Sequence, residues 1–261
     1  QLATIILDSP VEFDENLFLK KEPIESELIP LLKELEFNQL GKRIIGKPIH
    51  QEQQMSLFGI DKSPEDKNDQ LSNFKTKNAS YKLIQTKEEH QTFISILLKQ
   101  TEVAFDTETD SLDVKKAEIL GISFCFKKES AYYCDLSKDP SLLNLYQSFF
   151  NSNQLKIAHN LKYDYGVISN HGLDISGPFF DTMIAHYLID PEKRHNLDQL
   201  SRNFLNYEPI TIESIIGNKK NPDKTMKEVE IEDLKNYAAE DADITFQLFE
   251  IFKLKIENNN L

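Results

Sequence analysis

The sequence of 261 residues has only two cysteines, Cys125 and Cys134, and they do not form a CxxC pair. This scarcity argues against a structural zinc site and favours a reducing, cytosolic environment. We expect both cysteines to behave as buried small apolar residues on neighbouring strands.

Long apolar segments are also missing. No run of about 18 apolar residues exists, so no transmembrane helix and no membrane partner are expected. Residues 1–15 have no basic flank and no small-residue cleavage site, so they do not resemble a signal peptide. There are no internal repeats. The 39% hydrophobic content still suffices for the core of one domain of about 150–200 residues plus extra segments.

Positive charge is in short supply, with 30 Lys and Arg against 43 Asp and Glu and a net charge of −13. The excess of acids is nine in residues 79–261 and four in residues 1–78. This balance counts against a broad basic surface for nucleic acid. An acidic domain can still bind a nucleic acid strand if divalent cations lie between its carboxylates and the phosphates, although weakly when alone.

The chain changes character twice along its length. Residues 28–44 have apolar residues at helical spacing and predict one helix that stops near Gly41. Residues 46–79 are polar, without sustained periodicity, and predict a flexible linker. We therefore expect three parts: a tail at 1–45, the linker at 46–79 and a folded domain at 80–261.

The folded domain has the pattern of an α/β protein. Strands are expected at 81–86, 102–109, 118–127, 130–136 and 155–160, and helices at 88–100, 142–150, 160–172, 181–190, 195–205 and 229–256. The short polar turn KKES joins the third and fourth strands and predicts a hairpin. The order of elements predicts a mixed sheet, with antiparallel hairpin strands plus parallel strands, flanked by helices.

The first site of chemical interest is Asp106-Thr-Glu108, at the end of a mostly apolar strand. Residues two apart on a strand face the same side, and open α/β sheets bind ligands at the carboxyl ends of their strands. Two carboxylates there suit Mg²⁺ or Mn²⁺. The alternative is a solvated strand end followed by a turn.

Two further pairs have helical spacing. Asn160 and Asp164 share a face where a strand gives way to a helix; alone they could be an N-cap and a favourable first-turn charge. Tyr237 and Asp241 share a face of the long helix at 229–256, and the two alanines after Tyr237 allow close approach to another element. An ordinary packed helix could show the same pair.

The ordered set DxE, Nx₃D and Yx₃D resembles the DEDD superfamily of 3′→5′ exonucleases, in its tyrosine branch. More narrowly, VAFDTETDSLD, KIAHNLKYD, FFDTMIAHYLIDP, HNLDQLSRNFL and LKNYAAEDADITFQL resemble the proofreading domain of bacterial DNA polymerase I, over about residues 80–257. Residues 1–45 resemble the end of the 5′-nuclease domain of that polymerase. The resemblance implies a ribonuclease H-like fold, and a polymerase domain in the full-length enzyme.

The resemblance also implies roles. Two divalent cations about 3.5–4 Å apart would be bound, with Mg²⁺ expected and Mn²⁺ or Zn²⁺ as alternatives. Asp106 would bridge both ions, Glu108 and Asp241 would complete the tighter site, and Asp164 would hold the second ion. Tyr237 would orient the attacking water with Glu108.

Other residues are expected around this centre. Leu112 would lie beside the terminal base, and Thr107 and Asp181 would support the metal ligands without binding metal, Asp181 also as an N-cap. The remaining candidates for DNA contacts are Asn160, Arg194, Lys219, Lys220 and Lys224, whose charged members could instead be solvated loop residues. Ile212 departs from the family, which tends to place an aromatic there to stack on the second base.

The expected function is therefore hydrolysis of phosphodiester bonds at the 3′ end of single-stranded or frayed DNA, with release of nucleoside monophosphates. The expected protein is a cytoplasmic monomer, associated with the nucleoid through DNA. Two alternatives remain: a free-standing RNA-trimming exonuclease of the same superfamily, and a non-catalytic nucleic-acid clamp. A clamp of this kind would have lost metal carboxylates, whereas all four are present here.

Overall fold

The computed structural model describes residues 14, 19, 22–35, 37–45, 71–74, 79–217 and 224–259. The chain divides into two compact units, 1–66 and 67–261. None of the described helices combines the length and apolar character needed to cross a membrane. Most of the predicted linker lies outside the described residues, as does most of the segment 1–21, so the expected three-part division stays a prediction.

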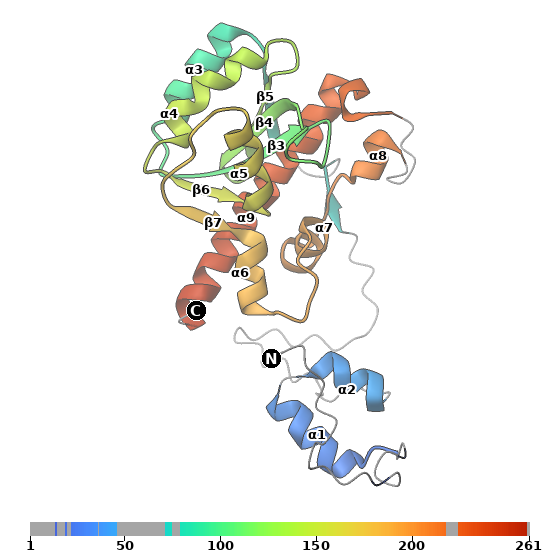
Figure 1. Ribbon diagram of the computed structural model, residues 1–261. Coiled ribbons are helices and arrows are strands. Elements are labelled where there is room, and N and C mark those ends of the chain that lie inside the picture. Colours follow the sequence, from blue (N-terminus) through green and yellow to red (C-terminus); the bar gives the residue numbers. More distant parts are fainter. Residues whose placement is uncertain are drawn as a thin grey trace, which may run out of the picture. The chain divides into compact units, whose positions relative to one another are not determined.

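The first unit contains two helices, α1 (Glu25–Glu34) and α2 (Asn38–Ile45), shown in blue in Figure 1. The prediction of one helix stopping near Gly41 is therefore wrong. The break comes earlier, after Leu35, and Gly41 lies buried inside α2. A glycine inside a helix costs only about 1 kcal/mol, so it did not have to mark the end.

The second unit is built on a six-stranded mixed sheet with the strand order β2-β5-β4-β3-β6-β7 (Figure 1). The strands β3, β4 and β5 are antiparallel neighbours, and the other pairings, β2 with β5, β3 with β6 and β6 with β7, are parallel. The bounds are β2 (Ser80–Ile84), β3 (Glu102–Thr109), β4 (Ile119–Lys127), β5 (Ser130–Asp135), β6 (Leu155–Ala158) and β7 (Phe179–Asp181). The mixed α/β sheet and its hairpin are confirmed.

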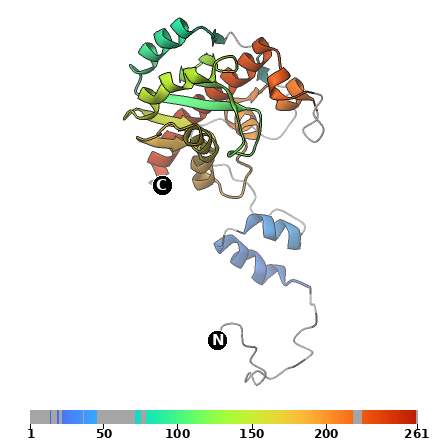
Figure 2. The same ribbon diagram turned by 45° about the horizontal axis from the view of Figure 1, so that its top comes forward.

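Helices cover both faces of the sheet, as Figures 1 and 2 show. One face packs against α3 (Lys87–Leu97), the 3₁₀ helix η2 (Pro140–Tyr146), α4 (Gln147–Phe150) and α5 (Leu161–Asn170). The other face is crossed by α9 (Ile231–Asn259), which contacts β2 through β6. Between β7 and α9 lie α6 (Thr182–Ile189), α7 (Leu197–Leu200), the π-helical η3 (Ser201–Leu205), α8 (Ile212–Ile216) and the 3₁₀ helix η4 (Met226–Glu228).

The close approach of α9 to the sheet depends on small side chains. Ala239 and Ala242 of α9 are fully buried against Ala104 of β3, Cys125 of β4 and Ala131 of β5. Of the two alanines that follow Tyr237, Ala239 makes this contact and Ala238 is buried in the cluster with Tyr133 of β5, so the predicted close approach is confirmed. Cys125 and Cys134 are buried on neighbouring strands, also as predicted.

Several short elements have no clear sequence signal. The parallel pair β1 (Ser72–Asn73) and β8 (Tyr207–Glu208) brings the end of the predicted linker onto the folded unit. A two-residue strand is too short to show a periodicity, so only the tertiary pairing defines it.

Two buried acids in the middle of α9, Glu240 and Asp243, connect this helix to the neighbouring elements. Asp243 accepts hydrogen bonds from the Tyr81 hydroxyl at 2.9 Å, from the Glu129 backbone N–H at 2.9 Å and from Gln247 Nε2 at 2.8 Å. Glu240, one turn away, accepts from the Tyr207 hydroxyl at 2.5 Å. These bonds tie α9 to β2, to the β4–β5 turn and to β8.

We expect Asp243→Ala to lower the free energy of unfolding by about 3 kcal/mol or more, because one buried and two half-buried donors lose their acceptor together. Urea unfolding followed by circular dichroism measures this change. The matched control is Glu250→Ala, an exposed acid of the same helix, which should stay within about 0.5 kcal/mol of the wild type. Equal stability of the two variants would contradict the role of Asp243.

Candidate active site

Strand β3 carries Asp106 and Glu108 on the side of the sheet that α9 covers. Both lie on the same face of β3 as Ala104, which packs against α9. The predicted shared face is therefore confirmed. Across the β3–β4 ladder, Asp106 lies opposite Ser123 and Glu108 opposite Gly121. The register shifts between Glu108 and Thr109, so regular pairing ends directly after the second carboxylate.

Helix α9 brings the third carboxylate to the same place. One oxygen each of Asp106, Glu108 and Asp241 lie within 4.8 Å of one another. Tyr237, one turn before Asp241, donates a hydrogen bond to it. The first and third motifs, more than a hundred residues apart in the chain, therefore meet at the carboxyl end of the central strand.

Asp164 reaches the site from α5 but has a different partner. Its Oδ1 accepts hydrogen bonds from the Thr107 backbone N–H at 2.9 Å and from Thr107 Oγ1 at 2.7 Å, and it is 2% exposed. Strand β6 pairs with β3 only as far as Ala104, so the edge of β3 beyond Ala104 is not paired with β6, and Asp164 contacts Thr107 there. Thr107 thus holds Asp164 beside the three-carboxylate cluster.

Asp181 joins the starts of two helices. It is the N-cap of α6, accepting from Met183 N at 2.8 Å and Ile184 N at 3.3 Å, and the N-cap role predicted for it is present. It also accepts from the backbone N–H groups of Asn160 at 3.2 Å and Leu161 at 2.9 Å. One carboxylate therefore orients α5, and with it Asp164.

Asn160 occupies the N-cap position of α5, but its side chain makes no capping bond. The capping role considered for this side chain is wrong, because Asp181 satisfies the helix start. Asn160 has the left-handed backbone values φ 66° and ψ 48°, which asparagine tolerates well, and it is exposed. Its amide is accessible to a ligand.

The electrostatics of the cluster are those of acids without a counter-charge. Burial, and then the charges of Asp164 and Glu108, raise the pKa of Asp106 well above its usual value. Burial and the Asp164 charge raise the pKa of Glu108 to about 8, and Glu108 and Asp106 share a hydrogen bond. Burial raises the pKa of Asp164 to about 7, against the opposing bonds from Thr107. Burial and Glu108 raise the pKa of Asp241.

Tyr237 responds to the same charges. The Asp241 charge, and then burial, raise the pKa of its hydroxyl well above 10, so it stays protonated and can donate.

These features fit a cation site. Oxygen ligands in a buried group of like charges suit hard divalent cations such as Mg²⁺. Without one, burial and the neighbouring charges oppose the ionisation of these acids, which is why the pKa values of Asp106 and Glu108 are raised. Among the described residues, no ion pair joins these carboxylates to a lysine or arginine.

The predicted substrate-contact residues that the structure describes come from separate parts of the chain. Leu112 is 92% exposed, in the loop between β3 and β4. Arg194 is exposed between α6 and α7, and Lys224 is half-buried before η4. Lys219 and Lys220 lie outside the described residues. No hydrogen bond or ion pair between described residues links Leu112, Arg194 or Lys224 to the carboxylates.

Sequence reasoning missed the residues that hold the Leu112 loop. The Tyr163 hydroxyl donates to the Ser111 carbonyl at 2.7 Å, and Lys227 bridges Asp110 at 2.8 Å and Glu118 at 2.7 Å. Tyr163 sits inside the Nx₃D motif, which could have pointed to it. Lys227 has no comparable signal, because only the tertiary fold brings η4 to this loop.

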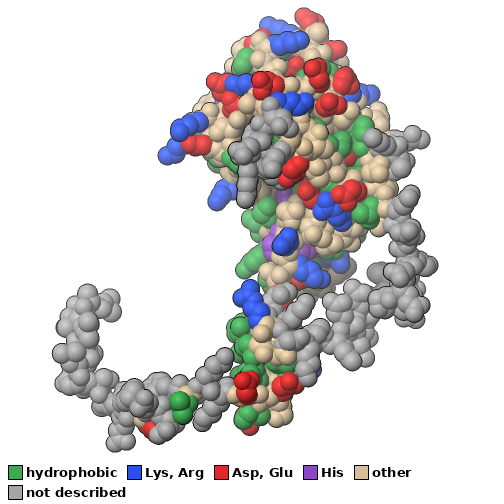
Figure 3. All heavy atoms as spheres, turned by 90° about the vertical axis from the view of Figure 1, so that its right-hand side faces the viewer, with side chains coloured by type: hydrophobic (Ala, Val, Ile, Leu, Met, Phe, Trp, Pro, Cys, Tyr) green, Lys and Arg blue, Asp and Glu red, His purple; other side chains and the backbone are tan. Residues whose placement is uncertain are grey.

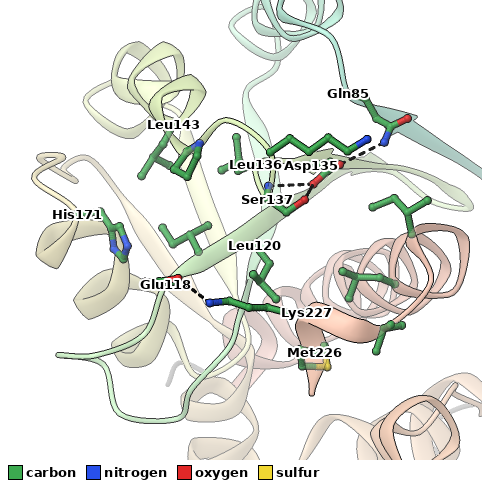
Figure 4. Close-up of a pocket in the computed structure, with 16 residues that line it drawn as sticks. Gln85, Glu118, Leu120, Asp135, Leu136, Ser137, Leu143, His171, Met226 and Lys227 are labelled. Carbon is green, nitrogen blue, oxygen red and sulfur yellow. Dashed lines mark hydrogen bonds and ion pairs between the residues drawn. The ribbon is translucent and has the colours of Figure 1, made fainter. Parts of the chain in front are cut away.

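A cavity of about 680 Å³ lies next to this region, between the start of β4, the end of β5, η4 and α9 (Figure 4). Its wall includes Lys227, Glu118, Asp135 and Leu234, but none of the four site carboxylates. We therefore assign the chemistry to the carboxylate cluster and not to this cavity.

The face drawn in Figure 3 shows Asp and Glu side chains interspersed with Lys and Arg. Basic side chains on this face do not merge into one patch, which agrees with the net charge of −13. Binding of a polyanion at the carboxylate cluster would therefore depend on cations.

Comparison with known proteins places this site in a family. A sequence model of the family described as 3′-5′ exonuclease matches residues 81–257. The DNA polymerase I of Borreliella burgdorferi is 35% identical over 200 residues, which are 74% of this chain and 22% of that protein. The DNA polymerase I of Pseudomonas aeruginosa is 28% identical over an alignment of 271 positions, which covers 98% of this chain and 28% of that protein. The chain spans about a quarter of the length of these relatives.

Solved structures share the fold. The catalytic core of RRP6 from Trypanosoma brucei superposes with a TM-score of 0.56 at 19% identity, over 70% of this chain and 51% of that one. Brucella melitensis NrnC with bound Mg²⁺ gives a TM-score of 0.53 at 17% identity, over 70% of this chain and 84% of that one. At such identities the likeness shows the ribonuclease H-like α/β fold alone. Because the family model covers more than half of the chain, the chain belongs to the 3′→5′ exonuclease family of nucleases that is also represented in bacterial DNA polymerase I.

Proposed function

We propose that the domain hydrolyses phosphodiester bonds at the 3′ end of single-stranded or frayed DNA, in a reaction that depends on two divalent cations and releases nucleoside monophosphates. The observation that carries the proposal is the cluster of Asp106, Glu108 and Asp241, with oxygens within 4.8 Å, beside the hydroxyl of Tyr237. Bound cations would supply Lewis acidity, lowering the pKa of water and neutralising charge on the phosphate.

Each residue then has a defined task. Asp106, Glu108 and Asp241 would hold one cation, and Asp106 with Asp164 would hold the other. Thr107 keeps Asp164 in place through two hydrogen bonds. The Tyr237 hydroxyl, already a donor to Asp241, would orient the attacking water together with Glu108.

The surroundings support a single-stranded 3′ end as substrate. The exposed Leu112 can contact the terminal base, and the accessible amide of Asn160 can contact the strand. Arg194, Lys219, Lys220 and Lys224 would contact phosphates. Ile212, half-buried at the start of α8, offers no aromatic ring for stacking on a second base.

The curated relatives favour DNA and a place next to a polymerase domain in a longer chain, because they are DNA polymerases I. We propose that such a protein works as a monomer in the cytoplasm, at the nucleoid. RNA is the second candidate substrate, because the solved structures with this fold include an RNase D bound to RNA. Rates on DNA and RNA oligonucleotides of the same sequence distinguish the two. A non-catalytic clamp is disfavoured by the complete set of carboxylates.

We expect EDTA to abolish activity and Mg²⁺ or Mn²⁺ to restore it, and Asp106→Ala to lower the single-turnover rate by several orders of magnitude, because both cations lose a ligand. Tyr237→Phe should be milder, since it removes one hydrogen bond and no metal ligand. Labelled oligonucleotides measure the rates.

The control for Asp106→Ala is Asp174→Ala, an exposed acid after α5. It should retain the wild-type rate. Metal-free stability of Asp106→Ala should hold or rise, because the variant removes an acid whose ionisation burial and the neighbouring carboxylates oppose. A folded Asp106→Ala protein with a near-normal rate would refute the site.

The substrate prediction concerns Leu112. Mispaired or single-stranded 3′ ends should be shortened faster than paired ends, and Leu112→Ala should raise KM several-fold with stability unchanged, because the side chain is 92% exposed. The control is Leu254→Ala, also exposed but near the end of α9. Digestion from the 5′ end, or equal rates on paired and mispaired ends, would count against this reading.

The raised acid pKa values predict how stability changes with pH. In EDTA the folded domain keeps protons on Glu108 up to a pKa of about 8 and on Asp164 up to a pKa of about 7, whereas the unfolded chain loses them near 4.5 and 3.8. The folded state binds more protons in this window, so stability is highest below it and falls as pH rises through it.

Thermal unfolding in EDTA across this window measures the effect. Glu108→Gln should flatten the decrease in Tm, and Asp174→Asn should leave it unchanged. Mn²⁺ should raise Tm more at the alkaline end, where fewer protons compete for the ligands. An increase in the metal-free Tm from acid to neutral pH that Glu108→Gln leaves unaltered would be inconsistent with the buried cluster.

A further inference from the structure

Tyr133 of β5 is fully buried, yet its hydroxyl has no hydrogen-bond partner among the described residues. The ring packs against Val229, Leu234 and Ala238 in the cluster under the start of α9. Buried tyrosine hydroxyls are normally paired, because an unpaired one loses its bonds to water without compensation. This hydroxyl can therefore still donate a hydrogen bond to a suitable acceptor.

The hydroxyl lies over Gly121 of β4. A Cβ built on Gly121 would overlap the hydroxyl oxygen and the adjoining ring carbons of Tyr133, so only glycine admits the ring here. Gly121 is the direct strand partner of Glu108 on one side and of Asp135 on the other. Directly opposed residues on an antiparallel pair have Cβ atoms roughly 5 Å apart, which puts the hydroxyl between these two acids.

Asp135 already has its donors. Its Oδ1 accepts from Ser137 N at 3.0 Å and Ser137 Oγ at 2.6 Å, and its Oδ2 accepts from Gln85 Nε2 at 3.2 Å (Figure 4). Glu108 differs, because it lies in the cluster with Asp106 and Asp241, where a divalent cation would bind. Of the two neighbours, Glu108 is the one whose carboxyl group would ionise and accept a further hydrogen bond when a cation binds.

We propose that Tyr133 is a positioning residue, whose hydroxyl donates a hydrogen bond to the Glu108 carboxylate, directly or through one water, when a divalent cation occupies the carboxylate cluster. The inference rests on the proposed metal-dependent function. An ionised carboxylate has about four acceptor sites, and a cation uses only part of them. A second donor fixes the orientation of the ligand, as outer partners of metal ligands generally do.

The electrostatics agree with this placement. After burial, the charge of Glu108 is the largest cause that raises the pKa of Tyr133, ahead of Asp135. The hydroxyl therefore keeps its proton beside an ionised Glu108, and toward that carboxylate it acts as the donor.

The test is Tyr133→Phe, with Mn²⁺ binding measured by isothermal titration calorimetry on the whole chain. We expect Mn²⁺ affinity to fall by about 10- to 100-fold, while the metal-free Tm stays equal or rises, because an unpaired buried hydroxyl is removed. A structural role alone would give no loss of Mn²⁺ affinity. The matched control is Tyr132→Phe, at the residue just before Tyr133. Tyr132 packs on the opposite face with Phe93, so this variant should bind Mn²⁺ as the wild type does.

A double-mutant cycle shows whether the effect passes through Glu108. In a Glu108→Gln background, Tyr133→Phe should weaken Mn²⁺ binding no further. An equal loss in both backgrounds, or unchanged affinity in the single variant, would overturn the proposal. If the wild type itself binds no Mn²⁺ and is active in EDTA, the proposed function fails, and this outcome is visible before any variant is compared.

Discussion

Three carboxylates with oxygens within 4.8 Å of one another, Glu108 buried and Asp106 and Asp241 half-buried, repel one another when all are charged unless a positive charge lies between them. In this domain that repulsion, together with burial, raises the pKa values of Asp106, Glu108 and Asp241, and divalent cations would relieve it in the active enzyme. The site is thus stable only when something neutralises it. Local repulsion is tolerated because the elements that carry the acids are held by contacts elsewhere.

Those contacts are of two kinds. Alanines let α9 lie close to the sheet, and the buried acids Glu240 and Asp243 tie the same helix to β2, β8 and the β4–β5 turn. On the other face Asp181 fixes the start of α5 and Thr107 receives Asp164. The backbone around the cluster is therefore fixed by interactions that do not involve the cluster's own charges, as a preorganised site requires.

The long, strongly patterned elements could be predicted from the sequence, and the short ones could not. The mostly apolar strand β3, the β4–β5 hairpin with its short polar turn and the long helix α9 lie close to their predicted bounds. Gly41 misled the reading of the first helix, because a glycine interrupts a helix only weakly. The capping considered as an alternative for the Asn160 side chain is absent for another reason: Asp181, 21 residues later, supplies the cap.

The sequence by itself determined the residue types and their spacing, and with them the family and the candidate ligands Asp106, Glu108, Asp164 and Asp241. Spacing of two or four residues defines a face of a strand or helix, and that information is local. Only the tertiary structure decided which faces meet and that Asp164 binds Thr107. It alone placed the hydroxyl of Tyr133 over Gly121, because contacts between distant segments depend on how whole elements pack.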